Sequence, residues 1–323
     1  MNMDIDLVYL WVDGSDPVWR AKRAAYEQGS SEVTPEAVDE ARFVNNDELK
    51  YSLRSVERYA PWIRHIYIVT DGQVPAWLDL TNPHILIIDH KEIMPAEALP
   101  SFSSPAIEWC IDNIPGLSEY FLLANDDTFI ARSATPGDFF TPNGFPIVRL
   151  RKRRKNKKNA ETIYMKTLFR AQTLIAEDFE RTYRYIPHHN IDAYRLSDFK
   201  KCKEKYSCLV NETIGRHFRH DDDLQRAIVL YYALAVGHGE MKLMGRYNRE
   251  MPIVDKIKGT LQGRYNYDAR SISIRDTDPQ HIINKYNPML FCLNDDERAS
   301  EEDRLRARAF LERMFPEKSE FEI

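Results

Sequence analysis

The stretch EYFLLANDDTFI, residues 119–130, combines an apolar run with three adjacent polar side chains, Asn125, Asp126 and Asp127. Its apolar part predicts a β-strand buried on both faces, as in a parallel sheet. Two adjacent carboxylates repel each other, and they are costly to bury unless a cation or several hydrogen-bond donors compensate their charge. The stretch therefore predicts an interior strand with a charged site at its carboxyl end.

Other short apolar segments on the amino-terminal side predict further strands at 5–12, 65–72 and 84–90. Between them, apolar residues recur at helical spacing from about residue 45, where Asn45 or Asn46 offers a cap, to Pro61. A second helix is expected over 103–114, because a serine and an early proline begin it. Strands that alternate with helices predict a Rossmann-like, three-layer α/β sandwich. Ligands of such folds gather at the carboxyl ends of the strands.

The composition changes after the turn signal Asn143-Gly144, where RLRKRRKNKKNAE, residues 149–161, concentrates positive charge. This basic run is predicted to be a loop, either solvated or docked on acceptor polymer, a polyanion or a membrane surface. Helical segments follow to about residue 185. A later helix is expected to carry three aspartates, 221–223, in its first turn. A strand at 289–295 and a helix at 299–315 end the pattern.

We therefore expect a single catalytic domain over 1–323. Its α/β core would span about 1–148 and be completed by about 216–323, with 149–215 as a basic loop and helical insertion. Formal net charge is -5 and the isoelectric point about 6.0, which argues against nucleic acid as a partner. The sequence has no signal-peptide pattern and no run of about 18 apolar residues. A cytoplasmic location is the expectation.

The acidic pair Asp126-Asp127 suits a hard divalent cation, Mg²⁺ or Mn²⁺, because such ions prefer carboxylates together with phosphate oxygens. Glycosyltransferases of the GT-A type use an Asp-rich motif of this kind for nucleotide-sugar diphosphates. The alternative is that one aspartate caps a turn and the other is solvated. The doublet by itself leaves these two interpretations equal.

Four further residues could belong to the same site. Glu108 could face the cleft from the helix that begins near Pro105, or lie on the surface. Arg219 could bind phosphate through its planar fork, or pair with the aspartates that follow it. His188 and His189 could supply a base or a ligand, or be structural.

Longer motifs resemble the Stealth family of hexose-1-phosphate transferases. That family includes bacterial capsular polysaccharide phosphotransferases and the catalytic subunit of lysosomal-enzyme N-acetylglucosamine-1-phosphotransferase. The resemblance spans almost the whole chain in four blocks: IDLVYLWVDGSDP; NNDELKYSLRSVERYAPWIRHIYIVTDGQVPAWL with LPSFSSPAIE and LLANDD; PHHNIDAYR with FRHDDDLQ; and LFCLNDD with MFPEKSEFE. The second block is long and specific.

The resemblance implies a GT-A-like fold and transfer of a hexose-1-phosphate from a UDP-sugar, commonly UDP-GlcNAc, to a hydroxyl of an acceptor glycan, with release of UMP. The nearest rival is a GT-A glycosyltransferase that attacks the anomeric carbon and releases UDP. A rival from another class is a binding module that holds polyanions or membranes through the basic run.

The resemblance also implies roles for single residues. Glu108 takes the position of a catalytic glutamate, as metal-shell residue or base, and Asp127 that of a metal-binding aspartate with Asp126 beside it. The catalytic histidine is expected at His188, with His189 as the alternative because PHHNID is shorter than the usual spacing.

Arg219 is expected to contact phosphate. The first block ends in Asp13, Gly14, Ser15 and Asp16, which resemble a nucleotide-binding strand end.

Overall fold

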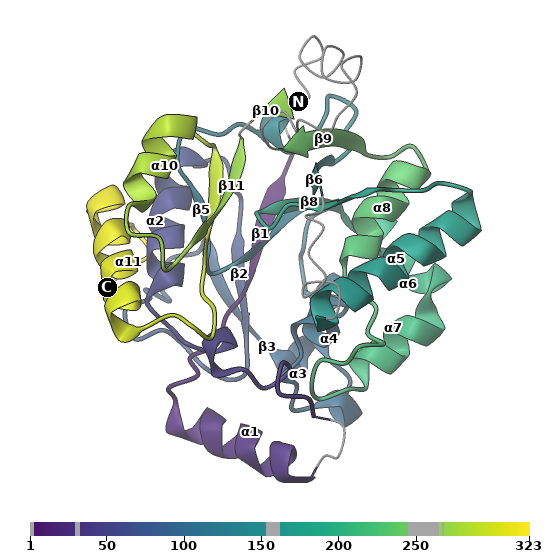
Figure 1. Cartoon of the computed structure of the whole chain (residues 1–323), viewed down its shortest axis with the longest axis horizontal. Helices are drawn as coiled ribbons and strands as arrows, with labels where there is room; N and C mark the ends of the chain where they lie inside the picture. The colour runs from purple at the N-terminus through teal and green to yellow at the C-terminus, as the bar shows by residue number, and fades with distance from the viewer. Residues whose placement is uncertain (1–2, 30–32, 153–161, 245–264, 267) are drawn as a thin grey trace.

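A five-stranded sheet lies at the centre of the computed structural model, which describes residues 3–29, 33–152, 162–244, 265–266 and 268–323 (Figure 1). Four parallel strands form most of it, and a fifth pairs antiparallel at one edge. In spatial order the strands are β3 (Ile85–Asp89), β2 (Ile66–Thr70), β1 (Ile5–Leu10), β4 (Tyr120–Asn125) and β8 (Asp192–Arg195). All strands predicted on the amino-terminal side are present.

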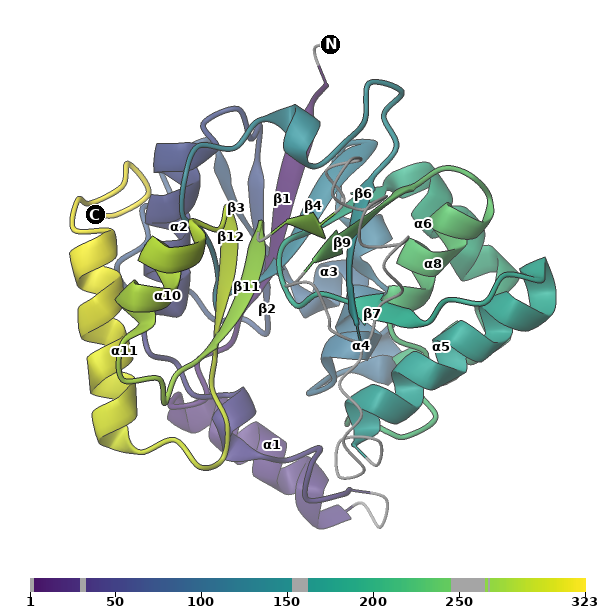
Figure 2. The same ribbon diagram turned by 45° about the horizontal axis from the view of Figure 1, so that its top comes forward.

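Side chains of β1 alternate between two apolar layers, as the pleat of a strand requires. Ile5, Leu7 and Tyr9 pack on one face with α2 (Glu48–Tyr59), whereas Val8 packs on the other with α5 (Ile163–Phe179) and α8 (Ala227–Ala235). Both views show α2 and α11 on one side of the sheet and α5, α6 and α8 on the other (Figures 1 and 2). The predicted three-layer α/β sandwich is confirmed.

The stretch 119–130 contains two strands in different sheets. After β4 the chain turns at Asp126 and Asp127 and enters β5 (Thr128–Ile130), which pairs with β12 (Leu290–Asn294). β11 (Ala269–Ser273) completes this sheet, and α10 (Pro279–Tyr286) and α11 (Glu301–Met314) supply side chains to its apolar cluster. The acidic pair thus lies on the turn that links the two sheets.

A third sheet corrects the prediction for the basic run. It consists of β10 (Tyr265–Asn266), β9 (Glu240–Met244), β6 (Ile147–Lys152) and β7 (Tyr185–Pro187). Residues 149–152 therefore belong to a strand, and only 1% of Arg149 is exposed. Its guanidinium donates to the carbonyl oxygen of Asp138 at 2.6 Å and lies 5.1 Å from the ring centre of Phe139, and these two contacts offset part of the cost of burying the charge. The rest of the run, 153–161, lies outside the described residues.

Two helix starts differ from the prediction. α8 begins at Ala227, and residues 221–223 lie in the turn before it, because the Asp223 carboxylate accepts a hydrogen bond from the backbone N–H of His220 and closes that turn. At the start of α2, Asp47 takes the N-cap position in the left-handed region, with φ of 65°, and its side chain makes no capping bond. The Asn45 side chain accepts a hydrogen bond from the Asp47 N–H instead. Local side-chain bonds to the backbone compete with the helical ones in both places.

The second predicted helix is short: α4 (Ser104–Glu108) is followed by a 3₁₀ turn at Ile111–Asn113. The other helices are α1 (Pro17–Gly29), α3 (His90–Ile93), α6 (Leu196–Lys205) and α7 (Ser207–Ile214), with 3₁₀ turns at Glu40–Arg42, Ala96–Ala98 and Pro136–Asp138. None of the helices in the described part of the chain combines the length and the apolar character that crossing a bilayer requires.

The predicted division of the chain stays a prediction. The segment 149–215 supplies more than helices, since its strand β8 pairs with β4 from Tyr120↔Arg195 to Leu123↔Asp192. One apolar cluster also joins β4 to α5 and α6 through Phe121, Leu168 and Phe199.

Candidate active site

A cavity of about 700 Å³ opens at the carboxyl ends of β1 and β4. This is the edge where an α/β sheet is expected to bind ligands. Its wall is built by segments that are far apart in the sequence: the β4–β5 turn, α4, the β7–β8 loop, the turn before α8, and the end of β12. The predicted site residues that line it are Glu108, Asp126, Asp127, His188, His189 and Arg219.

Three carboxyl groups gather at the β4–β5 turn. Burial raises the pKa of Asp126 well above its usual range, and the neighbouring charges of Glu48 and Asp127 raise it further. Glu48, from the start of α2, is 6% exposed, and burial raises its pKa to about 6. Like charges enclosed together are compensated most directly by a cation.

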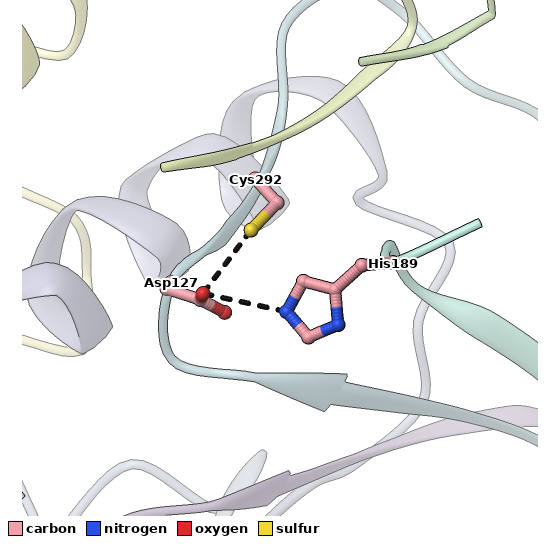
Figure 3. A group of neighbouring side chains, drawn as sticks. All are labelled: Asp127, His189 and Cys292. Carbon is pink, nitrogen blue, oxygen red and sulfur yellow. Dashed lines mark hydrogen bonds and ion pairs between the residues drawn. The ribbon is translucent and has the colours of Figure 1, made fainter. Parts of the chain in front are cut away.

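Asp127 leaves one oxygen for such a cation. Its Oδ1 is buried and has no hydrogen-bond partner among the residues that the structure describes. Its Oδ2 is close to the Nε2 of His189, at 3.4 Å, and to the Sγ of Cys292, at 3.1 Å (Figure 3). Burial alone would raise the pKa of Asp127, but His189 and the thiol together lower it below its ordinary value. The turn thus fits a divalent cation.

The two histidines have different surroundings. The Nδ1–H of His188 donates to the backbone carbonyl of His189 at 3.0 Å, and burial lowers the His188 pKa to about 3, which keeps this ring neutral. Burial also tends to lower the pKa of His189, but the carboxylate of Asp127 has the larger effect and raises this pKa above its usual value. Of the two candidates, His189 is the one in contact with the acidic turn.

Glu108 forms an ion pair with Arg226, the residue before α8, and only 6% of Glu108 is exposed. The Nη2 of Arg226 also lies 3.7 Å from the Oδ2 of Asp192. Burial raises the pKa of Asp192 to about 6 even though Arg226 opposes the shift. One guanidinium therefore compensates two buried carboxylates in the cavity wall.

Arg219 contacts the hydroxyl of Ser104 at the start of α4. Burial lowers its pKa to about 10, and the nearby Arg42 lowers it as well, so Arg219 remains cationic at neutral pH. The alternative prediction, pairing with the following aspartates, does not hold: Asp222 lies near Arg170, at 3.9 Å, and Asp223 binds Arg216, at 2.9 Å.

The Asp13–Asp16 segment forms a local turn, and none of its four residues is among the described residues that line the cavity. The Asp13 carboxylate accepts bonds from the N–H and hydroxyl of Ser15, at 2.9 and 2.7 Å. Asp16 accepts from the N–H of Val18 at 2.8 Å, near the start of α1. At Gly14 a Cβ would lie 2.2 Å from the carbonyl oxygen of Phe43, so the close approach requires glycine. Nucleotide binding by this segment stays a prediction.

Comparisons with known proteins bear on this site. Residues 42–148 match Stealth protein CR2, conserved region 2, and residues 3–31 match Stealth protein CR1, conserved region 1. The exopolysaccharide phosphotransferase cps2G of Lactiplantibacillus plantarum is 33% identical over 350 residues, which cover 99% of this chain and 96% of that protein. The chain belongs to the Stealth family.

Other similar proteins differ in length or in sequence from this Stealth chain. The capsular polysaccharide phosphotransferase SacB of Neisseria meningitidis serogroup A is 33% identical over 328 residues, and the match covers 99% of this chain but 57% of SacB. A crystal structure of the galactosyltransferase LgtC with donor and acceptor sugar analogues superposes with a TM-score of 0.42 at 10% identity, covering 97% of this chain and 96% of LgtC.

The sequence did not single out four residues at or beside the cavity: Glu48, Asp192 and Arg226, which line it, and Cys292, which contacts Asp127. The first two lie inside motifs quoted for the family resemblance, NNDELK and PHHNID, and Cys292 lies in LFCLNDD. Arg226 directly follows FRHDDDLQ. Their position in or beside these motifs was the available signal, but no spacing in the sequence shows that Glu48, Asp192 and Arg226 meet at one cavity or that Cys292 contacts Asp127.

Proposed function

We propose that the protein transfers a hexose-1-phosphate from a UDP-sugar to a hydroxyl of an acceptor glycan and releases UMP. One observation carries the proposal: an acidic turn, a cationic arginine and an imidazole paired with a carboxylate line the same cavity. These are the groups that phosphoryl transfer needs to compensate charge, bind phosphate and accept a proton. Membership in a family with relatives named polysaccharide phosphotransferases supports the same reaction. UDP-GlcNAc is the first donor to test.

Asp126 and Asp127 would hold Mg²⁺ or Mn²⁺, which would supply charge neutralisation for the donor diphosphate. Arg219, in the cavity wall beside Ser104, would bind the oxygens of the transferred phosphoryl group. A planar guanidinium suits that task because it donates two parallel hydrogen bonds.

His189 is the better proton acceptor of the two histidines. Asp127 holds its Nε2, which leaves Nδ1 to accept the proton, as in other carboxylate–imidazole pairs. A raised pKa also makes His189 a stronger base than His188, whose pKa is about 3. The acceptor hydroxyl would attack the phosphorus bonded to the hexose, its proton would pass to His189, and the bond from that phosphorus to the bridging oxygen of UMP would break.

Glu108 would act by position. Its carboxylate is already compensated by Arg226, so it would hold that guanidinium in the wall beside the substrate and would not serve as the base. A Glu108→Gln variant separates the two roles. If Glu108 is the base, the variant should lose the pH dependence of kcat that arises from ionisation of this carboxyl group. If Glu108 positions Arg226, the variant should keep the pH profile of the wild type at a lower rate.

The test is identification of the released nucleotide. The purified protein is incubated with a panel of UDP-sugars, Mg²⁺ and an acceptor glycan, and the products are separated by mass spectrometry. UMP together with a phosphodiester product supports the proposal, whereas UDP supports attack on the anomeric carbon. Binding of polyanions with no donor consumed would support the binding module. Asp127→Asn serves as the inactive control.

The predicted contact of the basic run with acceptor polymer or a membrane surface remains a proposal, as does the cytoplasmic location. Deleting 153–161 and assaying both a small soluble acceptor and a polymer would test the contact. Loss of the polymer reaction alone would support docking of the acceptor. Equal loss with both acceptors would argue for a structural role.

A further inference from the structure

Three potential metal ligands of different chemistry meet at the acidic turn: the carboxylate of Asp127, the imidazole of His189 and the thiol of Cys292. They come from the β4–β5 turn, the β7–β8 loop and the strand β12 (Figure 3). One ligand atom from each lies within 4.8 Å of the other two. The Oδ2 of Asp127 lies 3.1 Å from Cys292 Sγ and 3.4 Å from His189 Nε2.

This spacing suits a tetrahedral ion. Zinc binds sulfur at about 2.3 Å, imidazole nitrogen at about 2.0 Å and carboxylate oxygen at about 2.1 Å, which puts neighbouring ligand atoms roughly 3.3–3.8 Å apart. The two distances from Asp127 are close to this range, and the third pair, Cys292 Sγ and His189 Nε2, lies within 4.8 Å, so side-chain rotation of about 1 Å would let the three atoms surround one ion. A site with three protein ligands leaves the fourth position open to water.

The ligand types discriminate between metals. Mg²⁺ prefers oxygen ligands in octahedral geometry, whereas thiolate and imidazole select Zn²⁺. Of the cysteines in the described part of the chain, Cys292 alone belongs to such a cluster. It is fully buried, and its S–H points at the carboxylate.

A second observation points to a ligand at the same place. Asp127 Oδ1 is a buried acceptor without a hydrogen-bond partner among the described residues. A buried acceptor left unsatisfied is costly, and an ion bound to this carboxylate would compensate it.

We propose that Asp127, His189 and Cys292 form a Zn²⁺ site, and that Zn²⁺ bound there inhibits the transferase. Cys292 binds as the thiolate, and its proton is released to solvent. Zn²⁺ on Nε2 of His189 forces the ring proton onto Nδ1, the atom that would accept the substrate proton. It shares the carboxylate of Asp127 with the activating cation, and repulsion between the two ions weakens the binding of each. The metal-binding part of the proposal depends only on the cluster of three side chains, whereas the inhibition also depends on the proposed function.

Binding is tested without any assay of turnover. Co²⁺ replaces Zn²⁺ as the probe, because a cobalt–thiolate bond produces an intense near-ultraviolet absorption. The wild type should show this band at one Co²⁺ per chain, and Zn²⁺ should abolish it by displacement. Cys292→Ser should lose the band, and Cys208→Ser, which alters an exposed cysteine outside the cluster, should retain it. A wild type without the band, or a Cys292→Ser protein that keeps it, would overturn the site.

A fold check and one further variant protect the test against misfolding. Circular dichroism first establishes that Cys292→Ser is folded. His189→Ala, at a side chain that is 33% exposed, removes a second ligand with less risk to the core. It should weaken Co²⁺ binding by about tenfold or more. Unchanged affinity in His189→Ala would exclude the imidazole from the site.

Inhibition is measured as UMP release at fixed Mg²⁺ with increasing Zn²⁺. The Zn²⁺ concentration for half inhibition should rise with added Mg²⁺ and should be about tenfold or more higher in Cys292→Ser than in the wild type. Equal sensitivity of the two proteins would refute the regulatory part. Absence of UMP from the wild type would refute the proposed function and leave the cobalt result to judge the site.

Discussion

Glu108 and Arg226 form an ion pair in the cavity wall although 118 residues separate them in the sequence. Both side chains are largely buried, and Asp192 adds a second carboxylate 3.7 Å from the same guanidinium. A buried charge that loses its partner is far more costly than the pair is favourable. Arg226 is therefore expected to matter for stability as well as for the shape of the site.

Replacing Arg226 with methionine should lower the free energy of unfolding by about 3–5 kcal/mol, because two buried carboxylates lose their cation. Urea denaturation measures the change. Arg298→Met is the matched control, since Arg298 pairs with Asp296 at an exposed position and should change stability by less than about 1 kcal/mol. Equal effects of the two substitutions would contradict the ion-pair account.

Asp127→Asn should lower the rate of UMP release by about 10²-fold or more, the scale of losing one group that stabilises developing charge. The fold should persist, which circular dichroism can check, because asparagine has nearly the same size. Asp79→Asn, in a surface turn closed by Thr81, is the control and should retain activity. Near-normal turnover in Asp127→Asn would exclude the proposed role.

Arg219→Ala should also lower turnover by about 10²-fold or more, and Arg219→Lys should recover only part of it. Lysine restores the positive charge but not the planar fork that binds two oxygens. Steady-state kinetics with a UDP-sugar donor provide the measurement. Arg58→Ala, at an exposed position of α2, should behave like the wild type. Full activity of Arg219→Lys would show that charge alone suffices.

His188 should make the protein sensitive to acid. Its pKa in the folded state, about 3, lies below the ordinary value of about 6.5, so the unfolded state binds a proton first. The neutral ring therefore contributes fully to the stability of the folded state above pH 6.5. This contribution is lost progressively as the pH falls from 6.5 to about 3. Between pH 7 and pH 5 the wild type should lose about 2 kcal/mol more stability than His188→Asn.

Urea denaturation at the two pH values would test this. His84→Asn, at an exposed position, should follow the wild type. Parallel acid sensitivity of the wild type and His188→Asn would argue against a buried neutral imidazole.

Mg²⁺ should raise the melting temperature of the wild type but not that of Asp126→Asn. At a concentration about 100-fold above its Kd, a ligand stabilises the folded state by about 2.7 kcal/mol. The stabilisation should weaken below about pH 6, because burial raises the pKa values of Asp126 and Glu48 and protons then compete with the cation. Thermal unfolding at pH 7.5 and 5.5, with and without Mg²⁺, measures both effects. An equal rise in Asp126→Asn would place the ion elsewhere.

The strands β1, β2, β3 and β4 could be predicted from sequence, because each is a continuous apolar run whose hydrophobicity is a local property. The position of Asp126 and Asp127 after β4 followed from the same pattern. Arg149 is a residue for which the local pattern gave the wrong prediction. A basic run usually indicates a solvated loop, yet this arginine is buried in a strand. Its guanidinium donates to the carbonyl oxygen of Asp138 and lies over the ring of Phe139, contacts that the local sequence pattern does not reveal.

The order of amino acids is enough to assign the family, the α/β architecture and the types of side chain available for chemistry, because these depend on local patterns along the chain. Which of those side chains meet is visible in the folded chain alone. The fold paired Arg226 with Glu108, brought His189 and Cys292 to the carboxylate of Asp127, and kept the Asp13 turn out of the cavity wall. Such contacts join strands and turns far apart in the sequence, so they depend on how the sheets pack, which no local pattern encodes.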